Sequence, residues 1–271
     1  MGEPRRRAPS PARQPRAGVA EPATTAGAAM KGAVILAGGG GTPPEVPQTI
    51  LRLAGGANAR VVILAHVQQD VARGGRRSAE FFEENGAQNV IAPDTLDADE
   101  LTAIVQAARA VWIPGGDQNR FMERFGQATE LLRAIREVAA RGGVVGGTSA
   151  GASLMGARMP TGDHSPEGDL KVGASPTAPA IGVLANALVD QHFLKRQRLP
   201  RLLCALLEHP SLVGIGVDED AWALVQGGKL TVHRAQVVVA RVRGKPRQVD
   251  QLLGSRAIQL QVLLPGEQVA L

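Results

Sequence analysis

From residue 31 onward, short runs of β-branched and other apolar residues alternate with stretches whose apolar residues recur at helical spacing. The expected strands of the first half are Lys31–Ala37, Arg60–His66, Asn89–Ala92, Ala110–Pro114 and Gly143–Gly147, and the expected helices are Val46–Leu53, Arg77–Asn85, Ala98–Ala108 and Phe121–Ala140. Strands that alternate with helices form βαβ units, which build a mainly parallel sheet flanked by helices. This pattern predicts an α/β fold whose functional site lies at the carboxyl ends of the strands.

The second half of the chain is less regular. Residues 156–182 are rich in glycine, proline and small residues, which predicts an irregular loop region near the site. Ala221–Gln226 and Leu230–Ala240 are expected to be antiparallel strands, followed by a hairpin-like C-terminal segment. Since neither a linker nor a repeat interrupts the chain after residue 30, we expect a single α/β domain over residues 31–271.

Residues 1–30 form a Pro-, Ala- and Arg-rich segment of low complexity, which buries too little apolar surface to fold and is expected to be disordered. Its five arginines and two glutamates contribute +3 to the net charge of +5, which leaves +2 for the rest of the chain. A body so close to neutral does not indicate nucleic-acid binding. Aromatic residues make up only 3% of the chain and tyrosine is absent, so a stacking platform for bases is not expected either.

The sequence contains no apolar run of 18 residues, so no membrane-spanning helix is expected. The N-terminal segment lacks the apolar stretch of a secretory signal, which predicts a cytoplasmic protein. Met30 stands directly before the first expected strand and is an alternative start of translation. The single cysteine, Cys204, cannot form an intrachain disulfide and argues against a cysteine-based zinc site.

The apolar run Val144–Val145 leads into a Gly-x-Ser-x-Gly turn centred on Ser149, and a helix can follow. Strand, tight turn and helix in this order are typical of a nucleophile elbow, which exposes the serine hydroxyl at its tip. Small residues are required there because the backbone is strained and a larger side chain would clash. A Gly-rich turn without catalytic function has the same pattern, so Ser149 is a candidate nucleophile that needs further support.

A nucleophilic serine needs a general base, and the chain offers five histidines. They are His66, His164, His192, His209 and His233. His192 ranks first because its neighbours are polar and crowded, a setting typical of functional sites. His66 ranks second because it ends an expected strand. The others fit structural, surface or loop positions.

The strand expected over Leu212–Val217 delivers Asp218, Glu219 and Asp220 to one strand end. Only one of these carboxylates is expected to point inward, and spacing alone does not choose it. The turn at Gly115-Gly116 follows another expected strand, and backbone amides there can supply one oxyanion donor while the Ala150 amide supplies the other. Glycines that only provide conformational freedom would explain the turn equally well.

Four segments, in consistent order over about residues 31–240, resemble the serine peptidase family that contains the cyanophycinases and peptidase E. They are Pro114-Gly115-Gly116-Asp117-Gln118, Gly147-Thr148-Ser149-Ala150-Gly151-Ala152, Val189-Asp190-Gln191-His192-Phe193 with Arg196, Arg198 and Arg201, and Gly214-Ile215-Gly216-Val217-Asp218-Glu219-Asp220. The Asp-Gln-His-Phe block with its spaced arginines is specific to the cyanophycinase side. The resemblance implies a fold similar to class I glutamine amidotransferases and a reaction without metal or organic cofactor.

The resemblance also implies a triad of Ser149, His192 and Glu219, and so favours Glu219 over its two neighbours. This serine–histidine–glutamate order differs from that of the α/β-hydrolases. The expected oxyanion donors are the amides of Gly116 and Ala150. The residues expected to contact substrate are Gln118, Asp190, Gln191, Arg196, Arg198 and Arg201. For Asp190 two partners stay open, a substrate guanidinium or one of these arginines.

The implied substrate is cyanophycin, a poly-aspartate backbone with arginine on each side-chain carboxyl, cleaved to β-aspartyl-arginine dipeptides. Guanidinium groups suit an acidic peptide because they bind carboxylates through paired hydrogen bonds. Without the resemblance, the three arginines would be interpreted as a solvated basic helix start. Family relatives also suggest a homodimer. The expected partners are therefore an acidic or β-aspartyl peptide and a second copy of the chain, with neither nucleic acid nor membrane.

The chain departs from the family pattern at residues 64–69, Leu-Ala-His-Val-Gln-Gln, where relatives usually carry a small Pro-Thr-Ala-Ser-like turn. The loop at 156–182 and the Leu199-Pro200 pair are also unusual. These segments are expected at the rim of the site, so they bear on the substrate more than on the chemistry. Two further functions stay open: a dipeptidase for short α- or β-aspartyl peptides, and a non-catalytic binding protein on the same fold.

Overall fold

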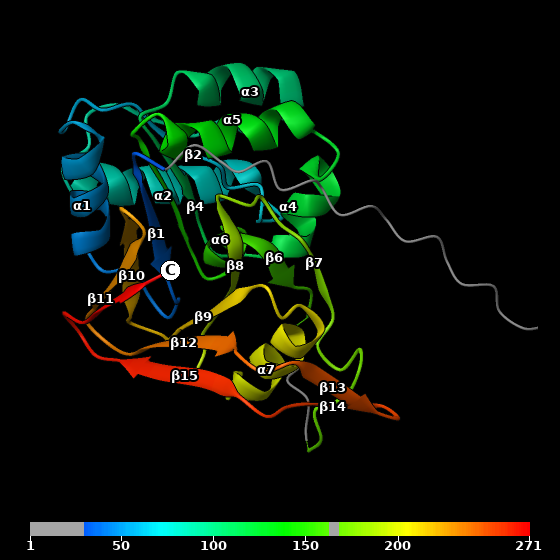
Figure 1. Cartoon of the computed structure of the whole chain (residues 1–271). Helices are drawn as coiled ribbons and strands as arrows, with labels where there is room; N and C mark the ends of the chain where they lie inside the picture. The colour runs from blue at the N-terminus through cyan, green and yellow to red at the C-terminus, as the bar shows by residue number, and fades with distance from the viewer. Residues whose placement is uncertain (1–29, 163–167) are drawn as a thin grey trace, which may run out of the picture.

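The computed structural model describes residues 30–162 and 168–271 (Figure 1). The tail expected to be disordered, apart from Met30, and His164 lie outside the described residues. The described helices are α1 (Glu45–Ala54), α2 (Val71–Glu84), α3 (Ala98–Gln106), α4 (Gln118–Phe125), α5 (Thr129–Ala140), α6 (Ala150–Ser153) and α7 (Leu199–Glu208). Within these ranges, no helix is long and apolar enough to cross a membrane.

The strands form two large sheets and one hairpin. The eight-stranded sheet has the order β16 (Gln268–Ala270), β11 (Lys229–His233), β10 (Trp222–Gln226), β1 (Ala33–Ala37), β5 (Val144–Thr148), β4 (Ala110–Ile113), β2 (Val61–Ile63) and β3 (Val90–Ile91). The six-stranded sheet has the order β15 (Ile258–Leu263), β12 (Val237–Val242), β9 (Val213–Val217), β8 (Leu184–Gln191), β6 (Gly156–Pro160) and β7 (Thr177–Pro179). β13 (Pro246–Val249) and β14 (Leu252–Ser255) form the separate hairpin.

Parallel pairing dominates the centre of both large sheets. In the first, β1, β5, β4, β2 and β3 are parallel neighbours, and β10 and β11 join antiparallel at one side. In the second, β6, β8 and β9 are parallel, while β12 and β15 are antiparallel. The predicted α/β fold with a mainly parallel sheet and antiparallel C-terminal strands is confirmed, but its strands are divided between two sheets.

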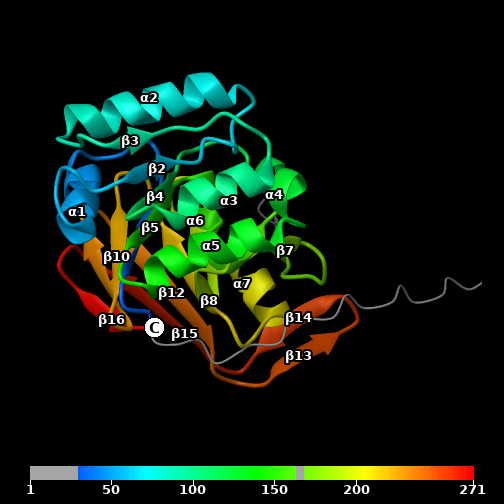
Figure 2. The same ribbon diagram turned by 90° about the horizontal axis from the view of Figure 1, so that it is seen from above.

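Helices cover the first sheet on both faces (Figures 1 and 2). Each residue of β1 is buried, as expected for a central strand with helices on either side. Alternate residues of β1 contribute to two apolar clusters: Ile35 packs with residues of α1 and α2, and Leu36 with residues of α3, α4 and α5. The cluster that contains Leu36 also includes Val189 and Ile215 of the six-stranded sheet, so one core joins both sheets.

Four expected elements are wrong in their extent. The helix expected over Arg77–Asn85 begins at Val71, where Asp70 caps it by accepting from Arg73 N. The single helix expected over Phe121–Ala140 is two helices, because Ala128, with ψ 70°, lies outside the helical region between the end of α4 and the start of α5. The strand expected over Leu230–Ala240 is divided at Arg234, whose φ of 69° turns the chain from β11 into β12 of the other sheet. The region 156–182 contains β6 and β7 rather than loop alone.

Candidate active site

Ser149 stands at the sharp turn between β5 and α6, with φ 53° and ψ −118°, a strained conformation for a residue other than glycine. Its backbone N–H donates to Ala37 O at 2.9 Å. A Cβ on Gly147 would lie 2.4 Å from Gly151 C, and one on Gly151 would lie 1.9 Å from Ile113 O. Both glycines of the Gly-x-Ser-x-Gly sequence are therefore required for the turn to close. The local geometry is that of a nucleophile elbow.

A chain of hydrogen bonds connects Ser149, His192 and Glu219, which come from three different loops. His192 follows β8, and Glu219 lies just after β9. Ser149 Oγ lies 2.9 Å from His192 Nε2, and His192 Nδ1 lies 2.7 Å from Glu219 Oε1. The imidazole is mostly buried and the glutamate side chain is 27% exposed. The three side chains expected to act together thus lie in hydrogen-bonding order.

The protonation states follow from the surroundings of each group. The hydrogen bond from His192 is the main factor that lowers the pKa of Glu219, so this side chain is a carboxylate and can only accept. Burial is the main factor that lowers the pKa of His192, although the Glu219 hydrogen bond raises it. A neutral His192 must then carry its proton on Nδ1, which donates to Glu219. Its Nε2 is left to accept the hydroxyl proton of Ser149.

The other described histidines do not reach Ser149. His66, the second-ranked candidate, is fully buried, with Nε2 2.8 Å from Thr95 O and its ring at the edge of Phe125. His209 Nε2 lies 3.2 Å from Thr177 Oγ1. His233 stacks on Trp222 with ring centroids 3.8 Å apart. Of the histidines within the described ranges, His192 alone can act on Ser149.

The Gly-rich segment after β1 contacts these hydrogen-bonded side chains, although no role was predicted for it from the sequence. Gly39 has φ 103°, and a Cβ there would lie 2.3 Å from His192 Cε1. Gly40 has φ 78°, and a Cβ there would lie 3.0 Å from Glu219 Cβ. His192 N donates to Gly38 O at 2.9 Å. Four consecutive glycines at a strand end were the available signal, because parallel strand ends carry functional loops.

The two expected oxyanion donors lie on loops next to Ser149. A Cβ on Gly115 would lie 3.5 Å from Ser149 Cβ, so the turn containing Gly115 and Gly116 packs against the serine. Gly116 is exposed, whereas Ala150 is buried. In the part of the chain that the structure describes, neither amide N–H donates to a protein acceptor. Both donors therefore remain available for a developing oxyanion.

Arg198 and Arg201, expected to contact substrate, are instead buried on Asp190. Their exposed fractions are 0% and 1%, and that of Asp190 is 0%. Arg201 donates to the Asp190 carboxylate from two nitrogens, Nε (2.7 Å from Oδ2) and Nη2. Arg198 Nη1 lies 3.7 Å from Asp190 Oδ1. Arg198 Nη1 also donates to Gln191 O at 2.7 Å. This burial does not fit direct contact with substrate; the network instead supports the backbone that leads to His192.

The remaining expected substrate contacts divide between the interior and the surface. Gln118 is buried and donates from Nε2 to Pro160 O at 2.8 Å, which uses one of its amide protons inside the protein. Gln191 is buried beside the serine, with its Oε1 3.3 Å from Ser149 Oγ. Arg196 is exposed and close enough to lower the pKa of His192 through its charge. Of the three arginines, Arg196 is the exposed one.

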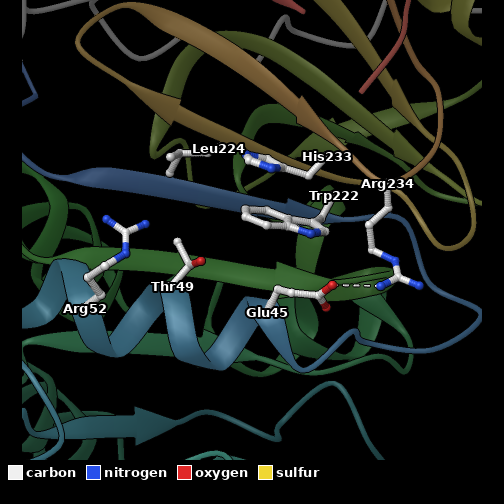
Figure 3. Close-up of a pocket in the computed structure, with 7 residues that line it drawn as sticks. All are labelled: Glu45, Thr49, Arg52, Trp222, Leu224, His233 and Arg234. Atoms are coloured by element: carbon white, nitrogen blue, oxygen red, sulfur yellow. Dashed lines mark hydrogen bonds and ion pairs between the residues drawn. The ribbon is translucent and has the colours of Figure 1, made fainter. Parts of the chain in front are cut away.

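A cavity of about 290 Å³ lies elsewhere, between α1 and the strands β10 and β11 (Figure 3). Its lining residues are Glu45, Thr49, Arg52, Trp222, Leu224, His233 and Arg234. Glu45 and Arg234 form an ion pair of 2.8 Å at one end. The hydrogen-bonded side chains around Ser149 do not line it, so geometry rather than cavity size locates the candidate active site. The described residues also contain no cluster of His, Cys, Asp or Glu that could hold a metal ion.

An elbow serine, a neutral imidazole and a carboxylate in hydrogen-bonding order, held by an α/β fold, define a serine-type hydrolase. The sequence model of Peptidase family S51 matches residues 34–233. The chain therefore belongs to peptidase family S51 and is a serine-type peptidase.

Known relatives agree with this family. A cyanophycinase of Geminocystis herdmanii is 35% identical over 188 residues, which cover 67% of this chain and 68% of the relative. A cyanophycinase of Trichormus variabilis is 33% identical over 208 residues, which cover 73% and 69%. The crystal structure of a peptidase from an acI-B1 actinobacterium aligns with a TM-score of 0.63 at 20% identity, over 90% of this chain and 99% of that one. This last similarity supports the fold alone.

Proposed function

We propose that this protein hydrolyses β-linked aspartyl peptides, and that cyanophycin is its substrate. The observation that carries the proposal is the hydrogen-bonded order of Ser149, His192 and Glu219 in a chain 35% identical to a cyanophycinase. The exposed Arg196 beside His192 supports an acidic substrate, because guanidinium groups bind carboxylates in pairs of hydrogen bonds.

In the proposed reaction, Ser149 Oγ attacks the scissile carbonyl carbon while its proton passes to His192 Nε2. The carbonyl oxygen becomes an oxyanion, which accepts hydrogen bonds from the amides of Gly116 and Ala150. His192 then donates the proton to the leaving amine as the C–N bond breaks, and an ester on Ser149 remains. Water, deprotonated by His192, attacks this ester; as the ester bond breaks, His192 returns the proton to Ser149 Oγ, and the acid product leaves. Glu219 holds the imidazole in place and stabilises its charged form throughout.

The test is product analysis after incubation with cyanophycin. We expect wild-type protein to release β-aspartyl-arginine, and Ser149→Ala to lower the rate by about 10⁴-fold or more with an unchanged melting temperature. Ser153→Ala is a matched control, since Ser153 lies four residues further along, buried in the same short helix. Near-full activity of Ser149→Ala would disprove the proposal.

A dipeptidase for short aspartyl peptides is the second candidate. It is favoured by the burial of Arg198 and Arg201, which leaves fewer cationic groups for an extended acidic polymer. Separate incubations with cyanophycin, β-Asp-Arg and Asp-Leu distinguish the two functions. Cleavage of a dipeptide without cleavage of the polymer would establish this alternative.

A further inference from the structure

The segment 64–69, where the chain departs from the family pattern, lies against the Gly115-Gly116 turn. Gln68 Nε2 donates to Gly115 O at 2.9 Å. In the same segment, Val67 O accepts from Asp117 N at 2.9 Å. These two hydrogen bonds hold the Gly-Gly turn from both sides of Gly116.

The hydrogen bond from Gln68 to Gly115 O also restrains the orientation of the Gly116 N–H. The peptide between Gly115 and Gly116 is trans, so its N–H points away from the carbonyl oxygen that Gln68 binds. Nothing within the described ranges accepts from the Gly116 N–H. The turn also packs on the serine, since a Cβ on Gly115 would lie 4.0 Å from Ser149 Oγ. Of the side-chain hydrogen bonds shown for residues 30–162 and 168–271, the one from Gln68 is the bond that resists rotation of this peptide.

We propose that Gln68 is a positioning residue for the oxyanion hole: by holding the Gly115 carbonyl, it aims the Gly116 N–H at the oxygen that becomes negative during the reaction. This inference rests on the proposed function of Ser149 and deepens it. It requires neither contact of Gln68 with substrate nor any particular peptide as substrate. An amide that is aimed in advance costs no reorganisation when the charge develops.

The protein makes specific room for the Gln68 carboxamide. Gly74 lies in the first half of α2, and a Cβ there would lie 2.1 Å from Gln68 Oε1 and 2.6 Å from its Cδ. A larger residue at position 74 would push the carboxamide away from Gly115. The backbone of the segment is also tied to α4, because Arg124 Nη1 donates to His66 O at 2.9 Å and to Gln68 O at 3.2 Å.

The first experiment replaces Gln68 with methionine, which keeps the size of the side chain and removes its amide donor. We expect Gln68→Met to lower kcat by about 10- to 100-fold while KM changes by less than about twofold, because the loss is confined to the transition state. The rate of Ser149 labelling by a fluorophosphonate, whose P=O occupies the same hole, should fall in parallel. The matched control is Gln69→Met, the same change at the exposed neighbouring position.

The second experiment displaces the carboxamide without changing Gln68. Gly74→Ala should lower kcat and the labelling rate as Gln68→Met does, with no fall in melting temperature, because alanine favours the helix. In a Gln68→Ala background, Gly74→Ala should have no further effect, since the displaced group is gone. Gly75→Ala is the control, because a Cβ there meets Ala92 and not Gln68.

Full kcat and full labelling rate in Gln68→Met, alongside an inactive Ser149→Ala, would overturn this inference and leave the proposed function intact. A fall in melting temperature with a rise in KM would also overturn it, since Gln68 would then be a structural residue. If the wild type cleaves no aspartyl peptide, the proposed substrate fails. The labelling rates of the variants still decide the role of Gln68 in that case.

Discussion

At the scale of single residues, two opposing influences act on His192. Burial favours the neutral imidazole, whereas the hydrogen bond and charge of Glu219 favour the protonated one. Burial dominates, so the pKa of His192 lies below its ordinary value of about 6.5. A general base must be neutral to accept the serine proton. The site therefore keeps its base ready for reaction to a lower pH than a free imidazole would.

This balance predicts the pH dependence of the reaction. Activity should be full above the pKa of His192 and be lost as the pH falls through it, with the midpoint of kcat/KM below about 6.5. Glu219→Gln removes the carboxylate whose hydrogen bond and charge raise the pKa of His192. The acidic side of the pH–activity profile should therefore move to lower pH, while kcat falls by about 100-fold or more. An activated ester and a peptide should give the same shift, since one imidazole serves both. A shift of the acidic side of this profile to higher pH would contradict the role of Glu219 as the carboxylate that raises the pKa of His192.

Gly39 provides a second residue-scale prediction. Gly39→Ala introduces a Cβ 2.3 Å from His192 Cε1 at a φ of 103°, so the imidazole must leave its place beside Ser149. We expect kcat to fall by about 100-fold or more, because misplacement by about 1 Å is enough for such a loss. Gly41→Ala is the control, since nothing lies within 4 Å of a Cβ at that position. Wild-type kcat in Gly39→Ala would show that the packing seen here is not required.

At the scale of elements, β8 and α7 are connected by the buried Asp190 network. Asp190 lies in β8 and Arg201 in α7, so their paired hydrogen bonds cross from strand to helix next to His192. Two guanidinium groups share one carboxylate, and the Gln191 and Gly162 carbonyls accept further hydrogen bonds from them. Such a network holds its geometry only when each partner is present.

Arg201→Ala should accordingly act through stability rather than through substrate recognition. The variant leaves the buried Asp190 carboxylate short of its main partner, which costs about 3–5 kcal/mol of the free energy of unfolding. We expect equal relative losses of kcat/KM on an aspartyl peptide and on an activated ester. Arg196→Ala, at the exposed arginine, should keep the melting temperature and weaken only peptide use. Melting temperatures, together with kcat/KM on the peptide and on the ester, distinguish the two variants. A loss confined to the peptide in Arg201→Ala would refute a purely structural role for Arg201.

Some features of the site could be predicted from the sequence and others could not. The elbow was predictable because glycines on both sides of Ser149 are a local requirement. The choice of Glu219 over Asp218 came from the family resemblance, since no local rule orients one carboxylate of three. The burial of Arg198 and Arg201 was not predicted, because a charge run is usually solvated, although the pairing of Asp190 with one of the arginines was an open alternative.

At the scale of the whole molecule, the alternation of strands and helices was sufficient for the α/β class but not for the number of sheets. Residues 230–240 contain no glycine or proline that would mark a turn, and their division between two sheets depends on the turn at Arg234. Periodicity records which residues are buried and not which sheet buries them. Periodicity likewise does not show that strand ends from both sheets meet at one site, because this arrangement forms only in the tertiary structure.

The carboxyl end of β1 binds all three of the segments that carry Ser149, His192 and Glu219. The N–H of Ser149 donates to Ala37 O, that of His192 to Gly38 O, and that of Asp220 to Gly39 O. Residues far apart in the sequence thus donate to three consecutive carbonyls, at the last residue of β1 and in the turn that follows it. A one-residue insertion or deletion there would misalign every reacting group at once. Because β1 is synthesised before the three segments that it binds, a nascent chain that ends before Glu219 cannot assemble the hydrogen-bonded set of Ser149, His192 and Glu219.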